Sequence, residues 1–164
     1  MKSRYSLTTI SMNKSFLYTL VTVPPWSHYA SACIGEIFSR ISELVETKQS
    51  WMINISFVSD EEMQALNKKY RNKDETTDVL SFHYFEDFSD LSDDEIAGEC
   101  IFSHARILSQ AEEYGHTPNA EFEILLIHSV LHILGYDHED DADFEEMFAI
   151  ERDIRAKMWL NEER

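Results

Sequence analysis

Three histidines in the second half of the chain carry the clearest chemistry in the sequence. His128 and His132 are four residues apart in an apolar stretch over 122–134 that predicts a buried helix, so their imidazoles lie on one helix face. Gly135 can end that helix in a left-handed conformation, and the chain then turns so that His138 returns toward the pair. Three neutral imidazoles that leave one position open are the ligands a catalytic zinc ion needs. The sequence therefore predicts one zinc ion per chain, held by these three residues.

The same histidines have a plainer interpretation, in which their ring nitrogens join a buried polar network. The spacing favours the metal, because it matches the three histidines and the glycine of the H-E-x-x-H-x-x-G-x-x-H metalloprotease pattern. Ser129 stands where that pattern has the glutamate that activates the zinc water, and a serine hydroxyl cannot take that proton at neutral pH. The chain keeps the predicted ligands of a metalloprotease and lacks its general base.

The rest of the chain predicts the elements that hold these residues in place. Runs rich in β-branched and aromatic residues predict four strands, at 15–23, 51–58, 77–85 and 97–103. Apolar residues at helical spacing predict about five helices, which begin at Ser27, at Ser59 or Asp60, at Ser103, at Thr117 and after the acidic residues 139–143. We expect a single α+β domain over residues 1–164, with a small mixed four-stranded sheet and a zincin-like central helix that carries the metal histidines. Residues 1–12 show no clear period and are interpreted as a loose N-terminal extension.

Two predicted helices have inner faces that the apolar pattern defines. For the helix after Ser59 the inward residues are Met63, Leu66 and Tyr70. For the last helix they are Phe144, Met147, Phe148, Ile150 and Ile154. The acidic segment 86–95 predicts a solvated loop, since it lacks the spacing and the glycine of an EF-hand calcium site.

Charge excludes one broad class of function. The formal net charge of −17 argues against general nucleic-acid affinity, because an acidic surface repels phosphate. Any RNA must be held by a local feature, and residues 67–73 provide one, with four of the fourteen cations within seven residues. These cations are Lys68, Lys69, Arg71 and Lys73.

Cysteine usage and hydropathy indicate the compartment. Cys33 and Cys100 form no C-x-x-C pattern, and each is expected to be a reduced core residue. The apolar run 16–23 is too short to span a bilayer. We therefore expect a cytoplasmic protein.

Two blocks of the sequence resemble the YbeY family of bacterial endoribonucleases and ribosomal-RNA maturation factors. The family signature is H-G-x-L-H-L-x-G-Y-D-H, and the residues that match it are His128, Leu131, His132, Gly135, Tyr136, Asp137 and His138. The second block comprises Leu66-Asn67, Tyr70-Arg71 and Thr77-Asp-Val-Leu-Ser-Phe82. Met147 and Glu151 also fall where the family tends to place such residues. The chain departs from the family at Ser129, which replaces a glycine, and at Glu99, which replaces an aspartate.

The resemblance implies a function. It implies metal-dependent cleavage of single-stranded RNA, with a role in small-subunit ribosomal RNA maturation and ribosome quality control. It implies that His128, His132 and His138 hold zinc and that Arg71 matters for activity. The implied partners are ribosomal RNA and the small ribosomal subunit with its proteins.

For Arg71 two interpretations stay open. It either faces the metal across a cleft and binds the scissile phosphate with two donors, or it pairs at the surface with Asp74, Glu75 or Asp78. The lysines at 68, 69 and 73 are candidates to guide the RNA backbone, and on an exposed helix they are otherwise simply solvated. Asp137 either orients a histidine or caps the turn.

Two other functions remain as alternatives. One is a non-catalytic ribosome-associated assembly factor that zinc stabilises, which suits the acidic surface because a partner protein would supply the RNA contacts. The other is a metalloprotease, which the missing glutamate disfavours.

Overall fold

The computed structural model describes residues 8–11, 16–20, 27–45, 51–85, 91 and 95–162, with side chains for 34–45, 52–85, 91 and 95–158. The strands are β1 (Thr8–Ser11), β2 (Phe16–Leu20), β3 (Trp51–Val58), β4 (Val79–His83) and β5 (Ile96–Ser103). The helices are α1 (Ser27–Leu44), α2 (Asp60–Arg71), α3 (His104–Tyr114), α4 (Pro118–Ile133) and α5 (Asp141–Glu162). The α+β class and the five helices are confirmed within these ranges.

Over the described residues the sheet has five strands in the order β1-β2-β3-β5-β4, so the prediction of four was wrong. The additional strand, β1, lies in residues interpreted as a loose extension, and it pairs antiparallel with β2. A strand of four residues is too short to show a period of its own, and it is held by the ladder that β2 offers. The other pairs are parallel for β2–β3 and β3–β5 and antiparallel for β4–β5, so the sheet is mixed, with β4 at an edge.

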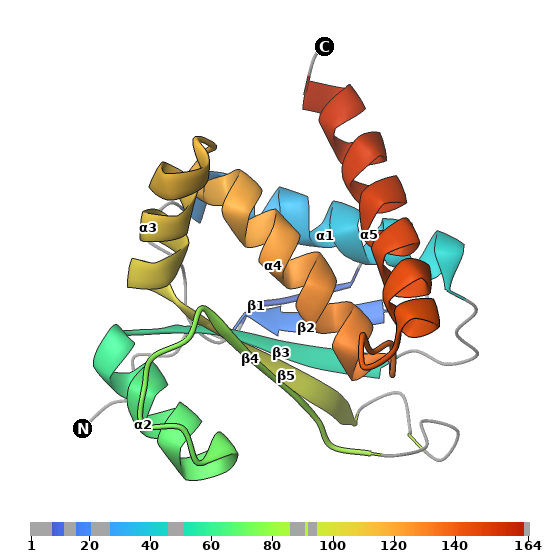
Figure 1. The fold of residues 1–164 in the computed structure, drawn as a ribbon. Helices are drawn as coiled ribbons and strands as arrows, with labels where there is room; N and C mark the ends of the chain where they lie inside the picture. Colours follow the sequence, from blue (N-terminus) through green and yellow to red (C-terminus); the bar gives the residue numbers. More distant parts are fainter. Residues whose placement is uncertain are drawn as a thin grey trace.

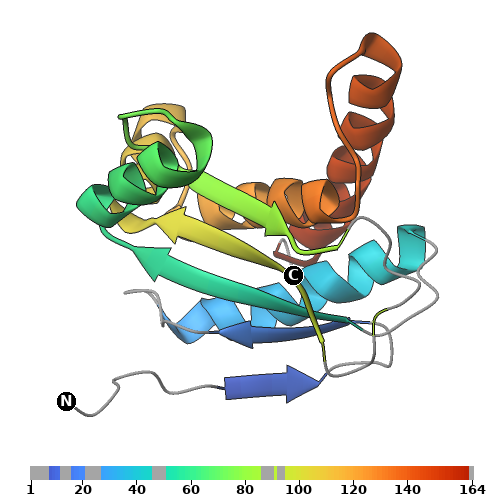
Figure 2. The ribbon, with the colours of Figure 1, turned by 90° about the horizontal axis from the view of Figure 1, so that it is seen from below.

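Helices cover one face of the sheet, and α2 packs at one end of the opposite face (Figures 1 and 2). Successive residues of a strand point to opposite faces. On β5, Cys100 and Phe102 therefore enter the large core beneath α1 and α4, while Ile101 joins a small cluster with Met63 of α2 and Leu80 of β4. The edge strand β4 thus has α4 on one side and α2 on the other.

Gly98 of β5 allows α4 to lie close to the sheet. A Cβ atom at this position would lie 2.5 Å from the carbonyl oxygen of Phe82 on β4 and 3.0 Å from Cγ2 of Ile133 on α4. The 2.5 Å contact with a backbone oxygen is not tolerated, so the absence of a side chain here is a packing requirement.

Local signals set the helix starts as the sequence predicted. Ser59 forms a capping box with Glu62 at the start of α2, and Ser103 and Thr117 cap α3 and α4. Gly115 ends α3 in the left-handed conformation, with φ of 73°.

The predicted inner faces were wrong at three aromatic residues. Tyr70 is 54% exposed, and Phe144 and Phe148 are 49% and 38% exposed, although Met63, Met147 and Ile154 are buried as expected. Periodicity places a residue on a helix face and does not show how far the neighbouring layer extends, which decides burial at the edge of that face.

Two further predictions concern the acidic loop and membrane-spanning helices. The loop predicted at 86–95 lies mostly outside the described residues, within which Leu91 is buried. In the described part of the chain, every helix is too short or too polar to cross a lipid bilayer.

Candidate metal centre and cleft

Helix α4 presents two imidazoles toward a cleft, and contacts from outside the helix hold each ring. His132 Nδ1 donates to the carbonyl oxygen of Tyr136 at 2.9 Å. His128 Nδ1 donates to the Glu151 carboxylate of α5 at 2.7 Å. Because each Nδ1 is a donor, the neutral rings carry their lone pairs at Nε2.

The two Nε2 atoms point at each other, with 3.0 Å between them. Two lone pairs at this distance repel unless a proton or a cation lies between them. Burial of the His132 ring, assisted by the adjacent His128, lowers the pKa of His132 below its usual value, which disfavours the proton. The arrangement therefore fits a cation, and neutral imidazole nitrogen is a preferred ligand of zinc.

A tight turn brings the third imidazole to this pair. Gly135 has φ of 94°, in the region that favours glycine, and the amide of Tyr136 donates to the Leu131 carbonyl. The Asp137 carboxylate accepts from the His138 amide at 2.7 Å, so its observed contact is that of a turn cap. His128, His132 and His138 then offer three ring nitrogens within 4.8 Å of one another, a group that could hold a metal ion.

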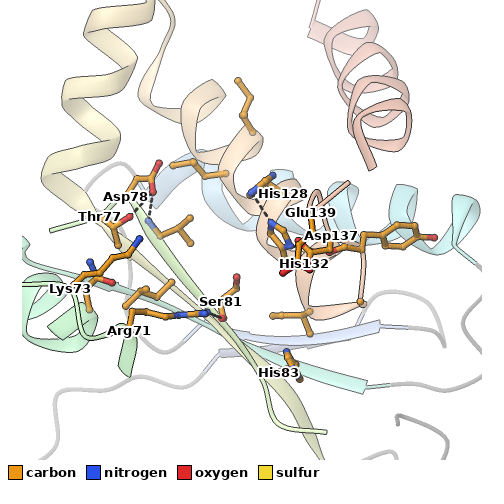
Figure 3. Close-up of a pocket in the computed structure, with 18 of the residues that line it drawn as sticks. Arg71, Lys73, Thr77, Asp78, Ser81, His83, His128, His132, Asp137 and Glu139 are labelled. Carbon is orange, nitrogen blue, oxygen red and sulfur yellow. Dashed lines mark hydrogen bonds between the residues drawn. The ribbon is translucent and has the colours of Figure 1, made fainter. Parts of the chain in front are cut away.

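The pair on α4 opens into a cleft of about 1000 Å³. Residues from α4 and the following turn line one side, and the end of α2, the segment after it and β4 line the other. Figure 3 shows His128 and His132 on one side of the cleft and Arg71, Lys73 and Ser81 on the other.

Arg71 reaches the cleft because α2 ends directly beside β4. Asn72 ends the helix with φ of 57°, and the buried side chain of Asn67 donates to the carbonyl of Glu75, which fixes the return of the chain. Arg71 Nη2 then donates to the carbonyl of Ser81 at 3.1 Å, and the guanidinium lies 5.7 Å from the centroid of the Phe82 ring.

Within the described residues, Arg71 makes no ion pair with a carboxylate, including Asp74, Glu75 and Asp78. Most of its donors are therefore free to bind an anion.

The three lysines singled out from the sequence have different surroundings. Lys73 lines the cleft. Lys68 Nζ pairs with the Asp74 carboxylate at 2.6 Å on the exposed surface. Lys69 Nζ lies over the Tyr70 ring, 4.8 Å from its centroid and outside the cleft lining. Only Lys73 of these three is brought to the side of the cleft that faces the histidines.

The two departures from the family pattern lie outside the cleft lining. Ser129 is fully buried, and its hydroxyl donates to the Leu125 carbonyl at 2.7 Å. The Glu99 carboxylate accepts from the Tyr84 hydroxyl at 2.8 Å. Burial first, and this bond second, raise the pKa of Tyr84 to about 12.

Sequence reasoning assigned no role to Glu151, although this residue holds His128. The sequence separation of 23 residues gives no local signal for such a contact. Helical spacing does place Glu151 four residues after the buried Met147, and the family pattern marks both positions.

The chain is similar to proteins of known family. The family described as YbeY, endoribonuclease YbeY, matches residues 26–159. Endoribonuclease YbeY of Macrococcus caseolyticus is 44% identical over 62% of this chain and 68% of its own length. Endoribonuclease YbeY of Spiroplasma citri is 36% identical over 76% of this chain and 82% of its own length.

A solved structure has the same fold. The solution structure of TM1509 from Thermotoga maritima matches with a TM-score of 0.57 and 23% identity, over 88% of this chain and 93% of that one. This likeness bears on the fold alone, while the family match and the relatives decide the membership. The chain belongs to the YbeY family.

Proposed function

We propose that this protein is a zinc-dependent endoribonuclease that hydrolyses phosphodiester bonds in single-stranded RNA. Its role is in small-subunit ribosomal RNA maturation and ribosome quality control in the cytoplasm, with the small ribosomal subunit and its proteins as partners. Residues 1–164 act as one domain. The relatives that are 34–44% identical carry the name endoribonuclease, which supports the reaction class.

The geometry of the cleft supports this proposal independently of family membership. Ring nitrogens whose lone pairs converge lie in the same cleft as an arginine that has no carboxylate partner among the described residues. A phosphodiester needs this combination, because its cleavage adds negative charge to a group that is already anionic.

The residues of the chain divide the chemistry between them. His128, His132 and His138 would hold the zinc ion, which would supply Lewis-acid charge and a water of lowered pKa when bound. Glu151 and the Tyr136 carbonyl keep Nε2 of two rings free to act as ligands.

On the opposite side of the cleft, Arg71 binds the scissile phosphate through its free donors, as guanidinium does with two parallel hydrogen bonds. Lys73 adds charge to the same side. Lys68 and Lys69 lie farther out, where they meet phosphates next to the cleaved bond. The Lys68 ion pair with Asp74 is exposed, so exchanging Asp74 for a phosphate costs little.

The central helix is zincin-like in that it carries two ligands four residues apart and a third after a glycine turn. Protease chemistry is disfavoured at Ser129, which is buried and bonded to its own helix. The function proposed is therefore that of a nuclease that uses a protease-like set of metal ligands.

The test compares wild type, Arg71→Ala and His132→Ala, purified in parallel, on a single-stranded RNA and on denatured casein. Arg71→Ala is expected to keep one zinc ion per chain and to lose about 100-fold or more in cleavage rate, because it removes stabilisation of the developing charge. His132→Ala is expected to lose both the zinc and the activity, and chelation should do the same to wild type.

The parallel purification controls for contaminating ribonuclease, since a contaminant would give equal rates in all three samples. Equal rates would reject the proposal. Zinc-loaded wild type that cleaves no RNA but binds the small ribosomal subunit would favour the non-catalytic assembly factor.

A further inference from the structure

A row of cations and aromatic rings runs along the surface beside the cleft. We call Lys69, Tyr70, Phe82 and Arg71 the aromatic strip. Lys69 Nζ lies 4.8 Å from the centroid of the Tyr70 ring, the Tyr70 and Phe82 centroids are 5.3 Å apart, and the Arg71 guanidinium is 5.7 Å from the Phe82 centroid. Each member touches the next, so the strip is continuous from Arg71 to Lys69.

The strip crosses the edge strand and leaves the cleft. On β4, Val79, Ser81 and His83 line the cleft, whereas Phe82 is absent from its lining and packs on the other face, against the cluster that contains Met63 of α2. Arg71 reaches both faces of β4. It lines the cleft, donates a hydrogen bond to the Ser81 carbonyl and lies near the Phe82 ring. A strand of RNA bound at Arg71 therefore meets the Phe82 and Tyr70 rings next.

Exposure sets Tyr70 apart from Met63 of α2 and Phe82 of β4. Met63 is fully buried and Phe82 is half-buried, but Tyr70 is 54% exposed, with a T-shaped contact to Phe82 that leaves much of its ring accessible. Lys69 is exposed as well. Its ammonium group is therefore free to move from the Tyr70 ring to a phosphate when a base takes its place on the ring.

Charge and ring chemistry together indicate the ligand. Three of the four members of the strip lie in the segment 67–73, which concentrates positive charge in a chain of net charge −17. Aromatic faces between cations are the usual platform for single-stranded nucleic acid, since every base has a stacking face and every nucleotide a phosphate. A basic or apolar protein segment would not gain from these cations.

We propose that Tyr70 stacks on an RNA base outside the cleft, while Arg71 and Lys69 contact the phosphates on either side. This inference rests on the proposed function and extends it by giving the path of the RNA. A base can lie on Tyr70 only when it is unpaired, so the strip also selects single strands over duplexes.

The experiment varies the base and the ring together. Binding to zinc-loaded protein is measured by fluorescence anisotropy with three labelled 2′-O-methyl decamers, of adenosine, of uridine and of abasic residues, each checked for integrity on a gel. Wild type is expected to prefer adenosine to uridine and uridine to abasic residues, in order of stacking strength. Tyr70→Ala should weaken adenosine binding on the order of tenfold, uridine binding less, and abasic binding not at all.

Matched variants separate the ring from other effects. Tyr70→Phe keeps the ring and should bind like wild type. Lys69→Ala should weaken all three decamers equally, since it removes a phosphate contact. Tyr114→Ala removes an exposed tyrosine on α3 and should change nothing. Urea midpoints close to wild type for every variant show that folding is intact.

The outcomes distinguish this inference from the function it rests on. If Tyr70→Ala binds the adenosine decamer like wild type, or loses equal affinity for all three decamers, the stacking role is wrong even when RNA is cleaved. If the adenosine preference depends on Tyr70 but zinc-loaded wild type cleaves no RNA, the strip stands and the nuclease function fails.

Discussion

Two histidines of α4 depend on acceptors that lie outside their own helix. The Tyr136 carbonyl and the Glu151 carboxylate fix which ring nitrogen carries the proton. The carbonyl is part of the backbone and comes with the turn. The carboxylate is a side chain, only 17% exposed, and can be removed by substitution.

Glu151→Ala is therefore expected to weaken zinc binding by about 10- to 100-fold, as loss of such outer partners does in other metal sites. Glu151→Gln retains an acceptor for His128 and should lose less. Zinc affinity, measured by competition with a chromophoric chelator, tests this directly and needs no RNA.

Glu145→Ala serves as the matched control, because Glu145 is an exposed carboxylate on the same helix. If the control weakens zinc binding as much as Glu151→Ala does, the effect comes from the general acidity of α5 and not from the contact with His128.

Between elements, Asp60 at the start of α2 joins three parts of the chain. Its carboxylate accepts from the hydroxyls of Ser103 at 2.6 Å and Thr76 at 2.9 Å, and Arg106 Nε lies 3.7 Å away. The bond from Ser103 lowers the pKa of Asp60 most; burial opposes it, and Thr76 and Arg106 add to it. This contact fixes α2, and with it Arg71, relative to β5.

A carboxyl whose folded-state pKa is lowered contributes stability above its ordinary pKa of about 3.9, and that stability is lost as the pH falls through the lower folded value. We expect Asp60→Asn to reduce the free energy of unfolding at pH 7 by about 1 kcal/mol, a figure that allows for the partial exposure of the group. The difference from wild type should shrink below about pH 3.9. Urea unfolding of both proteins at pH 7 and below about pH 3.9 measures this difference in the free energy of unfolding.

Glu113→Gln, at an exposed position near the C-terminal end of α3, is the control and should show no comparable loss at pH 7. The loss of unfolding free energy in Asp60→Asn could instead stay constant down to the lowest pH at which the protein folds. That result would show that the charge of Asp60 is not what stabilises the contact between α2 and β5.

How well an element could be predicted depends on how local its signals are. The start of α4 is determined by Thr117 and Pro118, adjacent residues with known preferences, and it was predicted correctly. Strand β1 depends on β2 for its hydrogen bonds, and the exposure of Tyr70 depends on where the sheet ends beneath α2. Such facts concern two elements at once, so a pattern within either one does not contain them.

At the scale of the whole molecule, charge limits how RNA can bind. A net charge of −17 repels phosphate, and the attraction must come from a few cations near the cleft. With Arg71, Lys73, Lys69 and Lys68 as phosphate contacts, and about 0.7 per contact for single strands, log affinity should fall with log salt with a slope of about −3.

Arg71→Ala should make this slope less negative by about 0.7, as expected for the loss of one contact. Arg152→Ala, which removes an exposed cation on α5, should leave the slope unchanged. A slope steeper than about −5 in wild type would mean that many more cations touch RNA than this surface offers.

For the candidate site too, local spacing was predictable from the sequence and contacts between separate elements were not. Spacing within one segment anticipated that the three imidazoles come together. It did not indicate that Arg71 would bond the Ser81 carbonyl, or that Glu151 would reach His128 from another helix. Those contacts arise only when α2, β4 and α5 are packed around α4, which depends on the complete core.

Gly98 has a consequence for the spacing between α4 and β4, the two elements on either side of the cleft. Ile133 of α4, the helix that carries two of the imidazoles, and the Phe82 carbonyl of β4, the strand that Arg71 bonds, both lie against this one residue. The close approach of α4 to β4 thus depends on the Cβ atom that Gly98 lacks. Even the methyl group of alanine there would push the two elements apart and change the distance between the imidazoles and the guanidinium without touching any of them.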